Sequence, residues 1–177
     1  PCTTFSRARQ FDGLGPPPLR TSDAIWGLSD LRPSDCRKLN EGNQLFNFTM
    51  KILHLCEQYK IPYVLENPLT SMAWEMPPMI HFMETFRPAF CDLDFCMYGE
   101  AWQKPTRLLS NYIDIADLSV RCMGSHLRCS RSKRPHRALK GTDSNGVFWT
   151  LRAQPYPWQL AQKFAALAAT ALSDTAR

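Results

Sequence analysis

The chain has 177 residues, of which 44% are hydrophobic, and its formal net charge is +5. This length is sufficient for a single domain with a hydrophobic core, and no apolar run is long enough to cross a membrane. Seven cysteines is an odd number, without the paired spacing of a small disulfide-bonded domain or a secretory signal, so we expect reduced thiols in an intracellular protein.

The first residues predict a cysteine on a tight loop. Pro1-Cys2 is followed by small residues, so the Cys2 thiol can face a pocket rather than a core. Because the chain begins inside such a loop, we expect it to be a fragment of a longer protein. Residues 7–32 are predicted to form an irregular loop. Its Gly13-Leu14-Gly15 run is no dinucleotide fingerprint, because no strand precedes it and prolines follow it.

A long helix is predicted next. It begins at Ser34 or Asp35, either of which can cap the exposed amides of the first turn, and it runs to about residue 59. Apolar residues recur at the helical period, so we expect a wide apolar face to pack on a sheet. The residues predicted for this face are Leu45, Thr49, Ile52, Cys56 and Tyr59, with Phe46, Met50 and Leu53 adjoining them.

A short strand is predicted at 61–65, directly before Glu66-Asn67-Pro68. The proline ends the run, so Glu66 falls at the carboxyl end of the strand, the edge at which open α/β sheets keep their ligand sites. The next elements expected are a short helix from Ser71, which Pro77-Pro78 interrupts and which resumes at 79–85, and an antiparallel pair of strands at 90–98 and 107–113. A short strand at 147–150 follows, and then a helix at 158–172 with Pro157 in its first turn.

The positive charge is concentrated in one segment. No Asp or Glu lies between Arg121 and Lys140, whereas seven cationic residues do. Such a block neutralises phosphates and releases counterions, which favours a nucleic-acid partner; the alternative is a solvated basic loop without a partner. The seven residues are Arg121, Arg128, Arg131, Lys133, Arg134, Arg137 and Lys140.

The same segment contains potential metal ligands. Two thiols, Cys122 and Cys129, and two imidazoles, His126 and His136, are plausible zinc ligands. Their spacing matches no standard zinc finger closely, so the alternative is that they are ordinary loop residues.

Three motifs in a fixed order resemble a known family. Pro1-Cys2-Thr3-Thr4-Phe5-Ser6, then Glu66-Asn67-Pro68, then Gln103-Lys104-Pro105-Thr106-Arg107 resemble the motifs of cytosine-5 DNA methyltransferases, in a divergent branch carried by mobile elements and viruses. The resemblance covers most of the chain. It implies an α/β, Rossmann-like fold that depends on S-adenosylmethionine and is incomplete at its N-terminus. Residues 1–177 would form one catalytic domain, with 118–141 as a basic insertion or loop.

The resemblance also implies roles for individual residues. The Cys2 thiolate would add to C6 of a flipped cytosine, while a protonated Glu66 holds N3 and Arg107 contacts the base. These three groups would converge on one pocket at a sheet edge. The residues expected to contact nucleic acid are Ser6, Arg7, Arg9, Gln103, Arg131, Lys133 and Arg134. The partner would be DNA, with RNA as the alternative, in a nucleus or nucleoid.

Two departures from the family pattern keep an alternative open. Pro105 stands where the family has the first arginine of its strand motif. The glycine-rich cofactor loop of the family precedes the Pro-Cys loop, and here no residues precede it, so no cofactor-binding residue is assigned. The alternative is an inactive nucleic-acid-binding or structural remnant of a retroelement or viral protein.

Overall fold

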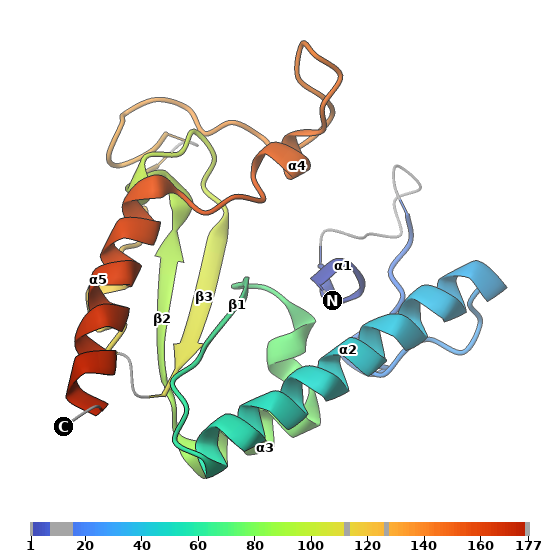
Figure 1. The fold of residues 1–177 in the computed structure, drawn as a ribbon. Helices are drawn as coiled ribbons and strands as arrows, with labels where there is room; N and C mark the ends of the chain where they lie inside the picture. The colour runs from blue at the N-terminus through green and yellow to red at the C-terminus, as the bar shows by residue number, and fades with distance from the viewer. Residues whose placement is uncertain (1, 8–15, 112–113, 126–127, 176–177) are drawn as a thin grey trace. The chain divides into compact units, whose positions relative to one another are not determined.

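The computed structural model describes residues 2–7, 16–111, 114–125 and 128–175, and its architecture is mixed α/β (Figure 1). The chain divides into two compact units. The first comprises residues 1–63 and 67–88, and the second comprises residues 64–66 and 89–177. No helix among the described residues is long and apolar enough to cross a membrane.

Helix α2 (Pro33–Gln58) dominates the first unit and confirms the predicted long helix. Pro33 occupies its first turn, where a missing amide hydrogen costs nothing. Arg32 precedes the helix and pairs with Asp35 in that turn at 2.7 Å. The helix ends at Tyr59, and the next residue, Lys60, has a left-handed backbone with φ of 55°.

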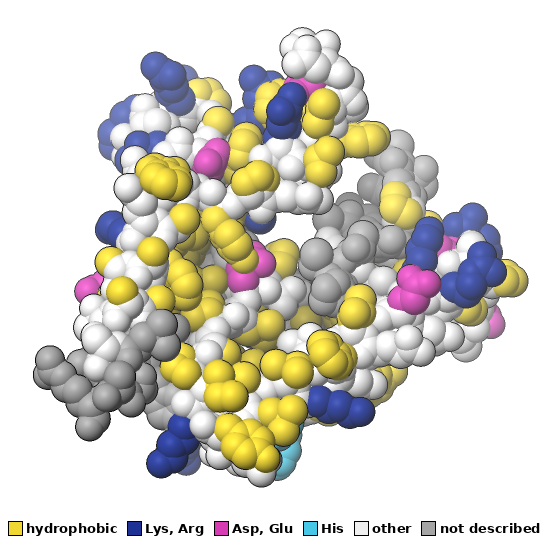
Figure 2. All heavy atoms as spheres, in the orientation of Figure 1, with side chains coloured by type: hydrophobic (Ala, Val, Ile, Leu, Met, Phe, Trp, Pro, Cys, Tyr) yellow, Lys and Arg dark blue, Asp and Glu magenta, His cyan; other side chains and the backbone are white. Residues whose placement is uncertain are grey.

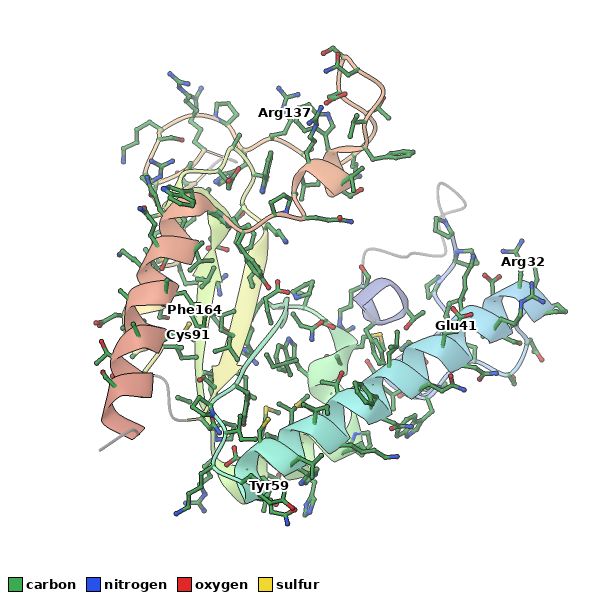
Figure 3. The ribbon with its side chains drawn as sticks, viewed as in Figure 1. Arg32, Glu41, Tyr59, Cys91, Arg137 and Phe164 are labelled. Carbon is green, nitrogen blue, oxygen red and sulfur yellow. The ribbon has the colours of Figure 1, made fainter. Side chains whose placement is uncertain are left out.

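The predicted buried face of this helix is wrong in part: Cys56 and the adjoining Phe46, Met50 and Leu53 are buried, but the centre of the face is not. Leu45, Ile52 and Tyr59 are exposed, with 49%, 41% and 64% of their surface accessible, and Figure 3 shows Tyr59 at the C-terminal end of the helix. The adjoining stripe is buried instead. Apolar residues cover so much of the helix circumference that the period alone does not select one stripe. The buried residues are Asp35, Leu39, Gly42, Phe46, Met50, Leu53 and Cys56.

The N-terminal turn α1 (Cys2–Phe5) packs on α2. The ring centroids of Phe5 and Phe46 lie 5.6 Å apart, and the guanidinium of Arg20 lies 3.8 Å from the Phe5 centroid. Arg20 is itself buried, and it donates hydrogen bonds to the Thr4 carbonyl oxygen at 3.0 Å and the Thr4 hydroxyl at 3.1 Å. These contacts fix the turn that carries Cys2.

Two short helices complete the first unit. Ser71 precedes the 3-10 helix η1 (Met72–Glu75), and its hydroxyl accepts a hydrogen bond from the Ala73 amide. Helix α3 (Pro77–Phe86) then begins at a proline, so the predicted interruption is confirmed. It ends at Arg87, whose φ of 48° is left-handed.

A three-stranded sheet forms the centre of the second unit, with β3 (Pro105–Ser110) between β1 (Val64–Pro68) and β2 (Ala89–Asp94). Residues 64–66 of β1 belong to this unit. Strands β2 and β3 run antiparallel, from the pair Ala89–Ser110 to the pair Asp94–Pro105, which confirms the predicted strand pair.

Three of the predicted strands need correction. The strand expected at 61–65 is β1, which begins at Val64 and runs to Pro68, so Glu66 lies in its middle and not at its carboxyl end; pairing with β3, rather than composition, sets its bounds. β2 ends at Asp94, because Phe95–Tyr98 forms the 3-10 helix η2. No strand lies at 147–150: Phe148 forms only an isolated bridge with Thr142, and Trp149–Arg152 forms the short helix α4. β-rich composition does not create a strand where no neighbouring strand is available to pair.

Helix α5 (Trp158–Thr175) covers the second unit's sheet and confirms the predicted final helix. Leu160 is buried among core residues of the sheet, and Phe164 packs against the same cluster, where Figure 3 labels it next to Cys91 of β2. The short 3-10 helix η3 (Ala116–Leu118) closes this core. The buried members are Cys91, Leu93, Phe95, Tyr98, Leu108, Ile115, Leu118 and Leu160.

We predict that Gly42→Ala destabilises the protein, although alanine favours a helix over glycine by about 1 kcal/mol. The added Cβ would overlap the Thr4 hydroxyl, which is held by Arg20 and cannot move freely. Overpacking of this kind costs about 1–3 kcal/mol, so the steric term exceeds the propensity gain. Urea unfolding measures the difference. In a Thr4→Ala background the same substitution should become neutral or stabilising; equal destabilisation in both backgrounds would contradict the packing argument.

Candidate metal centre and candidate active site

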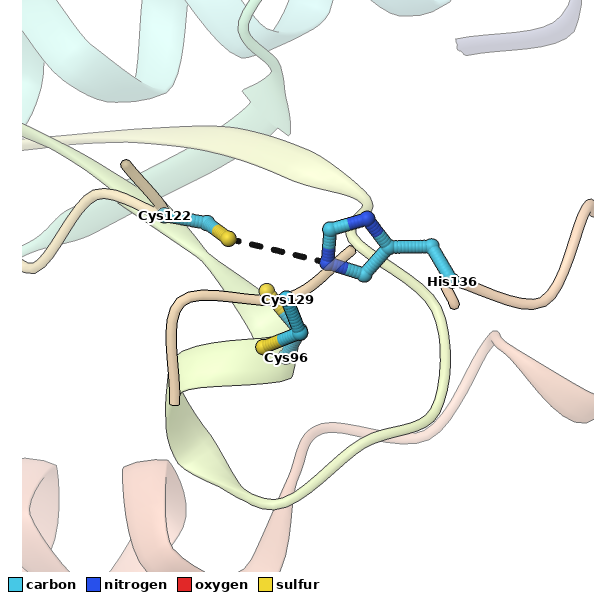
Figure 4. A group of neighbouring side chains, drawn as sticks. All are labelled: Cys96, Cys122, Cys129 and His136. Carbon is cyan, nitrogen blue, oxygen red and sulfur yellow. Dashed lines mark hydrogen bonds between the residues drawn. The ribbon is translucent and has the colours of Figure 1, made fainter. Parts of the chain in front are cut away.

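Three cysteines and one histidine of the second unit form a compact cluster (Figure 4). The Sγ atoms of Cys96, Cys122 and Cys129 and a ring nitrogen of His136 all lie within 4.8 Å of one another. Cys122 Sγ lies 3.6 Å from His136 Nε2. Cys96 and Cys129 are buried, and the other two side chains are half-buried. This arrangement can hold a metal ion.

A buried carboxylate positions the first two cysteines. Asp94 ends β2, two residues before Cys96, and is fully buried. Its Oδ2 accepts a hydrogen bond from the Cys122 amide at 2.7 Å and one from Arg121 Nε at 3.0 Å. The Asp94 amide donates to the Val120 carbonyl oxygen at 3.1 Å. The end of the strand therefore fixes the backbone on which Cys122 lies.

A tight hairpin positions the other two ligands. Arg128 and Pro135 form an antiparallel bridge, and the Cys129 amide donates to the Arg134 carbonyl oxygen at 2.8 Å. Lys133 closes the turn with a left-handed φ of 59°. Cys129 and His136 stand at the two ends of this hairpin, so one short loop supplies both ligands.

The three thiols have unequal acidities. Burial raises the pKa of Cys96, and its hydrogen bonds to the other two thiols raise it further. Burial also raises the pKa of Cys122 and Cys129, but hydrogen bonds outweigh it. Ser130 lowers the pKa of Cys122, and Ser132 with the Arg131 amide lowers that of Cys129 to about 7. Metals bind thiolates, so the lowered pKa of Cys122 and of Cys129 favours both as ligands.

The cluster adds one residue to the ligand set expected from sequence. Cys122, Cys129 and His136 come together as predicted, and among the described residues Cys96 joins them. His126 lies outside the described residues. Cys96 was missed because it belongs to the 90–98 run that was interpreted as a strand, far from the other ligands in sequence. No spacing signal in the sequence points to Cys96, because Cys122, His126, Cys129 and His136 already make up the four ligands of a tetrahedral site.

Glu66 lines a pocket between the sheet and α5 of the second unit. The pocket has a volume of about 350 Å³. Val64 and Glu66 both contribute to it because alternate residues of a strand share a face. Burial raises the pKa of the Glu66 carboxyl, and the Lys104 ammonium offsets part of that rise. The lining residues are Val64, Glu66, Leu108, Tyr156, Leu160, Ala161 and Phe164.

Tyr156 faces the same pocket. Burial raises the pKa of its phenol, and the Glu66 carboxylate raises it further, so the two groups influence each other. At neutral pH the phenol therefore keeps its proton and can donate a hydrogen bond. The pocket thus combines apolar walls with two polar groups that are both inclined to be protonated.

The structure does not bring Arg107 into this pocket. Arg107 is the cross-strand partner of Asp92, and it binds both carboxylate oxygens, at 2.7 Å and 2.9 Å. Its neighbour Leu108 lines the Glu66 pocket, so Arg107 points to the opposite face of β3. Gln103 is half-buried just before β3, and its carbonyl oxygen accepts the Phe95 amide at 2.7 Å.

The residues around the Pro-Cys turn belong to the first unit. The side chain of Cys2 and all of Arg9 lie outside what the structure describes. Ser6 and Arg7 line a second pocket of about 350 Å³, together with Arg20. Both carboxylate oxygens of Glu75 accept hydrogen bonds from Arg7 Nη2. Burial lowers the pKa of Arg20 to about 10, which leaves its guanidinium charged at neutral pH.

Arg131, Lys133 and Arg134 lie on the hairpin between Cys129 and His136, and all three are exposed. Arg131 Nε donates to the Cys96 carbonyl oxygen at 2.7 Å, and Lys133 Nζ donates to the Ser130 carbonyl oxygen at 2.7 Å. Figure 2 shows Lys and Arg side chains gathered over the loops of this part of the second unit.

No protein-family model, curated protein or solved structure matches this chain.

We predict that the purified protein retains a metal ion and that Cys96→Ser loses it, because the site then keeps only three strong ligands. Elemental mass spectrometry after gel filtration measures the bound metal. Cys36→Ser is the matched control, since Cys36 lies on α2 outside the cluster. Retention of metal by Cys96→Ser together with its loss in His126→Asn would favour the ligand set expected from sequence.

Proposed function

We propose that the chain is the catalytic region of a cytosine-5 DNA methyltransferase with a Rossmann-like fold. The observation that carries this proposal is the environment of Glu66: a carboxyl in the middle of β1, in a largely apolar pocket, with a pKa raised by burial. An acid that retains its proton is what the chemistry requires at this position.

Cytosine C5 is a weak nucleophile until the ring is activated. A thiolate that adds to C6 pushes electrons through the ring to N3, and a proton donor at N3 accepts that electron density. C5 then becomes an enamine-like carbon. In the proposed reaction Cys2 forms the bond to C6 and Glu66 holds its proton at N3. A carboxylate without its proton would repel the electrons that gather at N3, so the raised pKa of Glu66 supports this role.

The fold supports the proposal at a coarser level. Strand β3 lies between β1 and β2 and runs antiparallel to β2, which resembles the antiparallel pair at the end of a methyltransferase sheet. The three motif segments lie on α1, on β1 and on the approach to β3. The buried contacts of Arg20 with Thr4 support a fixed backbone for the turn that carries Cys2.

S-adenosylmethionine is the proposed methyl donor. No strand followed by a glycine-rich loop occurs in the part of the chain that the structure describes, so we assign no residue to this cofactor and derive no step through it. Ser6 and Arg7, which line the pocket beside Arg20, are the proposed phosphate contacts near the flipped nucleotide.

We propose zinc as the metal of the cluster. Three thiolates and one imidazole are a common donor set of structural zinc sites, and four protein ligands leave no open position for a reacting water. The Asp94 carboxylate is not a ligand, but it accepts a hydrogen bond from the Cys122 amide and so holds the backbone of that ligand in place. Zinc would therefore contribute to folding rather than to methyl transfer.

One observation favours an inactive nucleic-acid-binding remnant as the second candidate. Arg107, the residue expected to contact the base, is engaged by both carboxylate oxygens of Asp92. Pro105 already replaces the other arginine of that motif. A remnant would keep the fold and the basic surface without methyl transfer, so an activity measurement separates the two candidates.

We predict that Cys2→Ser abolishes methyl transfer in the full-length protein while leaving DNA affinity within about twofold, because a nucleophile contributes little to ground-state binding. DNA containing 5-fluorocytosine should trap the native protein covalently, since fluorine blocks release of the adduct, and gel electrophoresis would detect the complex. Cys36→Ser is the control and should still be trapped. Trapping of Cys2→Ser would place the nucleophile elsewhere, and no trapping of any variant would favour the remnant.

We predict that Glu66→Gln stabilises the protein at pH 8 but not at pH 4. Burial raises the folded-state pKa of Glu66, so the folded protein holds this proton more tightly than the unfolded chain. The ionised carboxyl therefore costs stability above the folded-state pKa, and this cost disappears as pH falls below the unfolded value. Urea unfolding at both pH values measures the effect. A Gln variant less stable than wild type at pH 8 would show that Glu66 is ionised and stabilised there, against the proposed role.

A further inference from the structure

We infer that the metal centre builds a phosphate-binding arm, and that zinc and the nucleic-acid backbone bind to the protein cooperatively. The arm is the hairpin segment 128–137, which contains the ligands Cys129 and His136. This inference rests on the proposed zinc site and on DNA as the proposed partner, and it adds a coupling between the two that methyl transfer does not require.

The first observation is the charge of the arm. It carries Arg128, Arg131, Lys133, Arg134 and Arg137, and the chain contains no Asp or Glu from 118 to 142. A block of like charges repels itself and disfavours a compact hairpin. A metal ion bound by Cys129 and His136 offsets this repulsion, because its bonds to the two residues link the ends of the hairpin.

The second observation is that no carboxylate of the described residues neutralises the positive charges of the arm. Among the described residues, Arg121 pairs with Asp94, Arg107 pairs with Asp92, and Arg152 pairs with Asp143. No ion pair joins a described carboxylate to a cation of the arm. Their polar contacts are to backbone carbonyl oxygens, as for Arg131 and Lys133, which leave the positive charge unneutralised.

The third observation is how little else holds the arm. The hairpin has one isolated bridge and no regular strand, and most of its side chains are exposed. Cys129 is the buried residue of the loop, with 3% of its surface accessible. The arm is attached through the cluster, through the Arg131 contact with Cys96, and through Arg137, whose amide donates to the Ala101 carbonyl oxygen at 2.8 Å and whose guanidinium lies 4.5 Å from the Trp149 ring centroid. Loss of the metal would loosen the turn between Cys129 and His136, which carries three of the charges.

A preordered loop binds with a smaller entropy cost than a loose one, so zinc should strengthen binding of a polyanion. Coupling between two ligands is reciprocal: the factor by which zinc tightens nucleic-acid binding is the factor by which nucleic acid tightens zinc binding. The repeated phosphates of a nucleic acid fit five cations within ten residues.

The test uses the Cys2→Ser protein, so that chemistry plays no part, with a fluorescent DNA duplex and fluorescence anisotropy across a salt series. Zinc-loaded protein should bind at least roughly tenfold more tightly than chelator-treated protein. The double variant Lys133→Asn, Arg134→Gln should lower the slope of log Kd against log salt by roughly two, one for each lost phosphate contact. Asparagine is chosen because it tolerates the left-handed backbone of residue 133.

The matched control is Arg37→Gln, Lys51→Gln, which removes the same charge from exposed positions of α2 and should leave the slope unchanged. Elemental analysis should show that both double variants keep their zinc. The reciprocal measurement is competition with a fluorescent zinc chelator, in which added duplex should lower zinc release by the same factor.

Equal DNA affinity with and without zinc, or an unchanged salt slope in the arm variant, would overturn the inference. So would competition by a polyglutamate peptide as effective as that by duplex DNA, which would indicate an acidic protein partner. Single-stranded DNA and duplex RNA are run in parallel, and tighter binding of RNA would overturn DNA as the partner. Absence of methyl transfer alone would contradict the proposed function and leave this coupling intact.

Discussion

The buried carboxylate of Asp94 is the contact on which the second unit depends. Burying a charge is unfavourable unless hydrogen bonds and an opposite charge offset the lost hydration. Asp94 meets that condition at Oδ2, which accepts from the Cys122 amide and Arg121, both from the irregular segment after the sheet, whereas its buried Oδ1 has no hydrogen-bond partner among the described residues. The end of β2 thereby anchors a long stretch that contains little regular structure among its described residues. The position of the metal cluster follows from this anchor, since Cys96 and Cys122 lie beside it.

The same sheet separates two chemical environments. On one face of β3, Leu108 and residues of α5 line the pocket of Glu66, and burial raises the pKa of its carboxyl. The neighbouring residue, Arg107, lies on the other face and donates two hydrogen bonds to Asp92. A one-residue alternation thus divides an apolar pocket from an ion pair. A carboxyl whose pKa is raised by burial and a guanidinium paired with a carboxylate would change each other's charge state or pairing if they shared one site.

The sequence predicted the helices and the paired strands with good accuracy. Proline at the first turn, a long apolar period and the β-rich runs are local signals, and they gave α2, α3, α5 and the β2–β3 pair. The wrong face of α2 shows the limit of such signals. Leu45 and Phe46 are equally apolar, and only the packing of α1 against the helix decides which of them is buried. The strand expected at 147–150 failed for a related reason, since pairing partners are a tertiary property.

By itself, the sequence determined the chemical inventory: the Pro-Cys turn, the acid before Asn67-Pro68, the basic segment and three of the four clustered ligands. Tertiary structure alone decided which of these groups meet. Cys96 joins the cluster because β2 ends at Asp94 and turns into η2, which no spacing rule encodes. The pKa of Glu66 is raised because residues distant in sequence, among them Leu160 and Phe164 of α5, line its pocket and bury the carboxyl. Burial and proximity depend on contacts between segments far apart in the chain, and a local pattern carries no information about them.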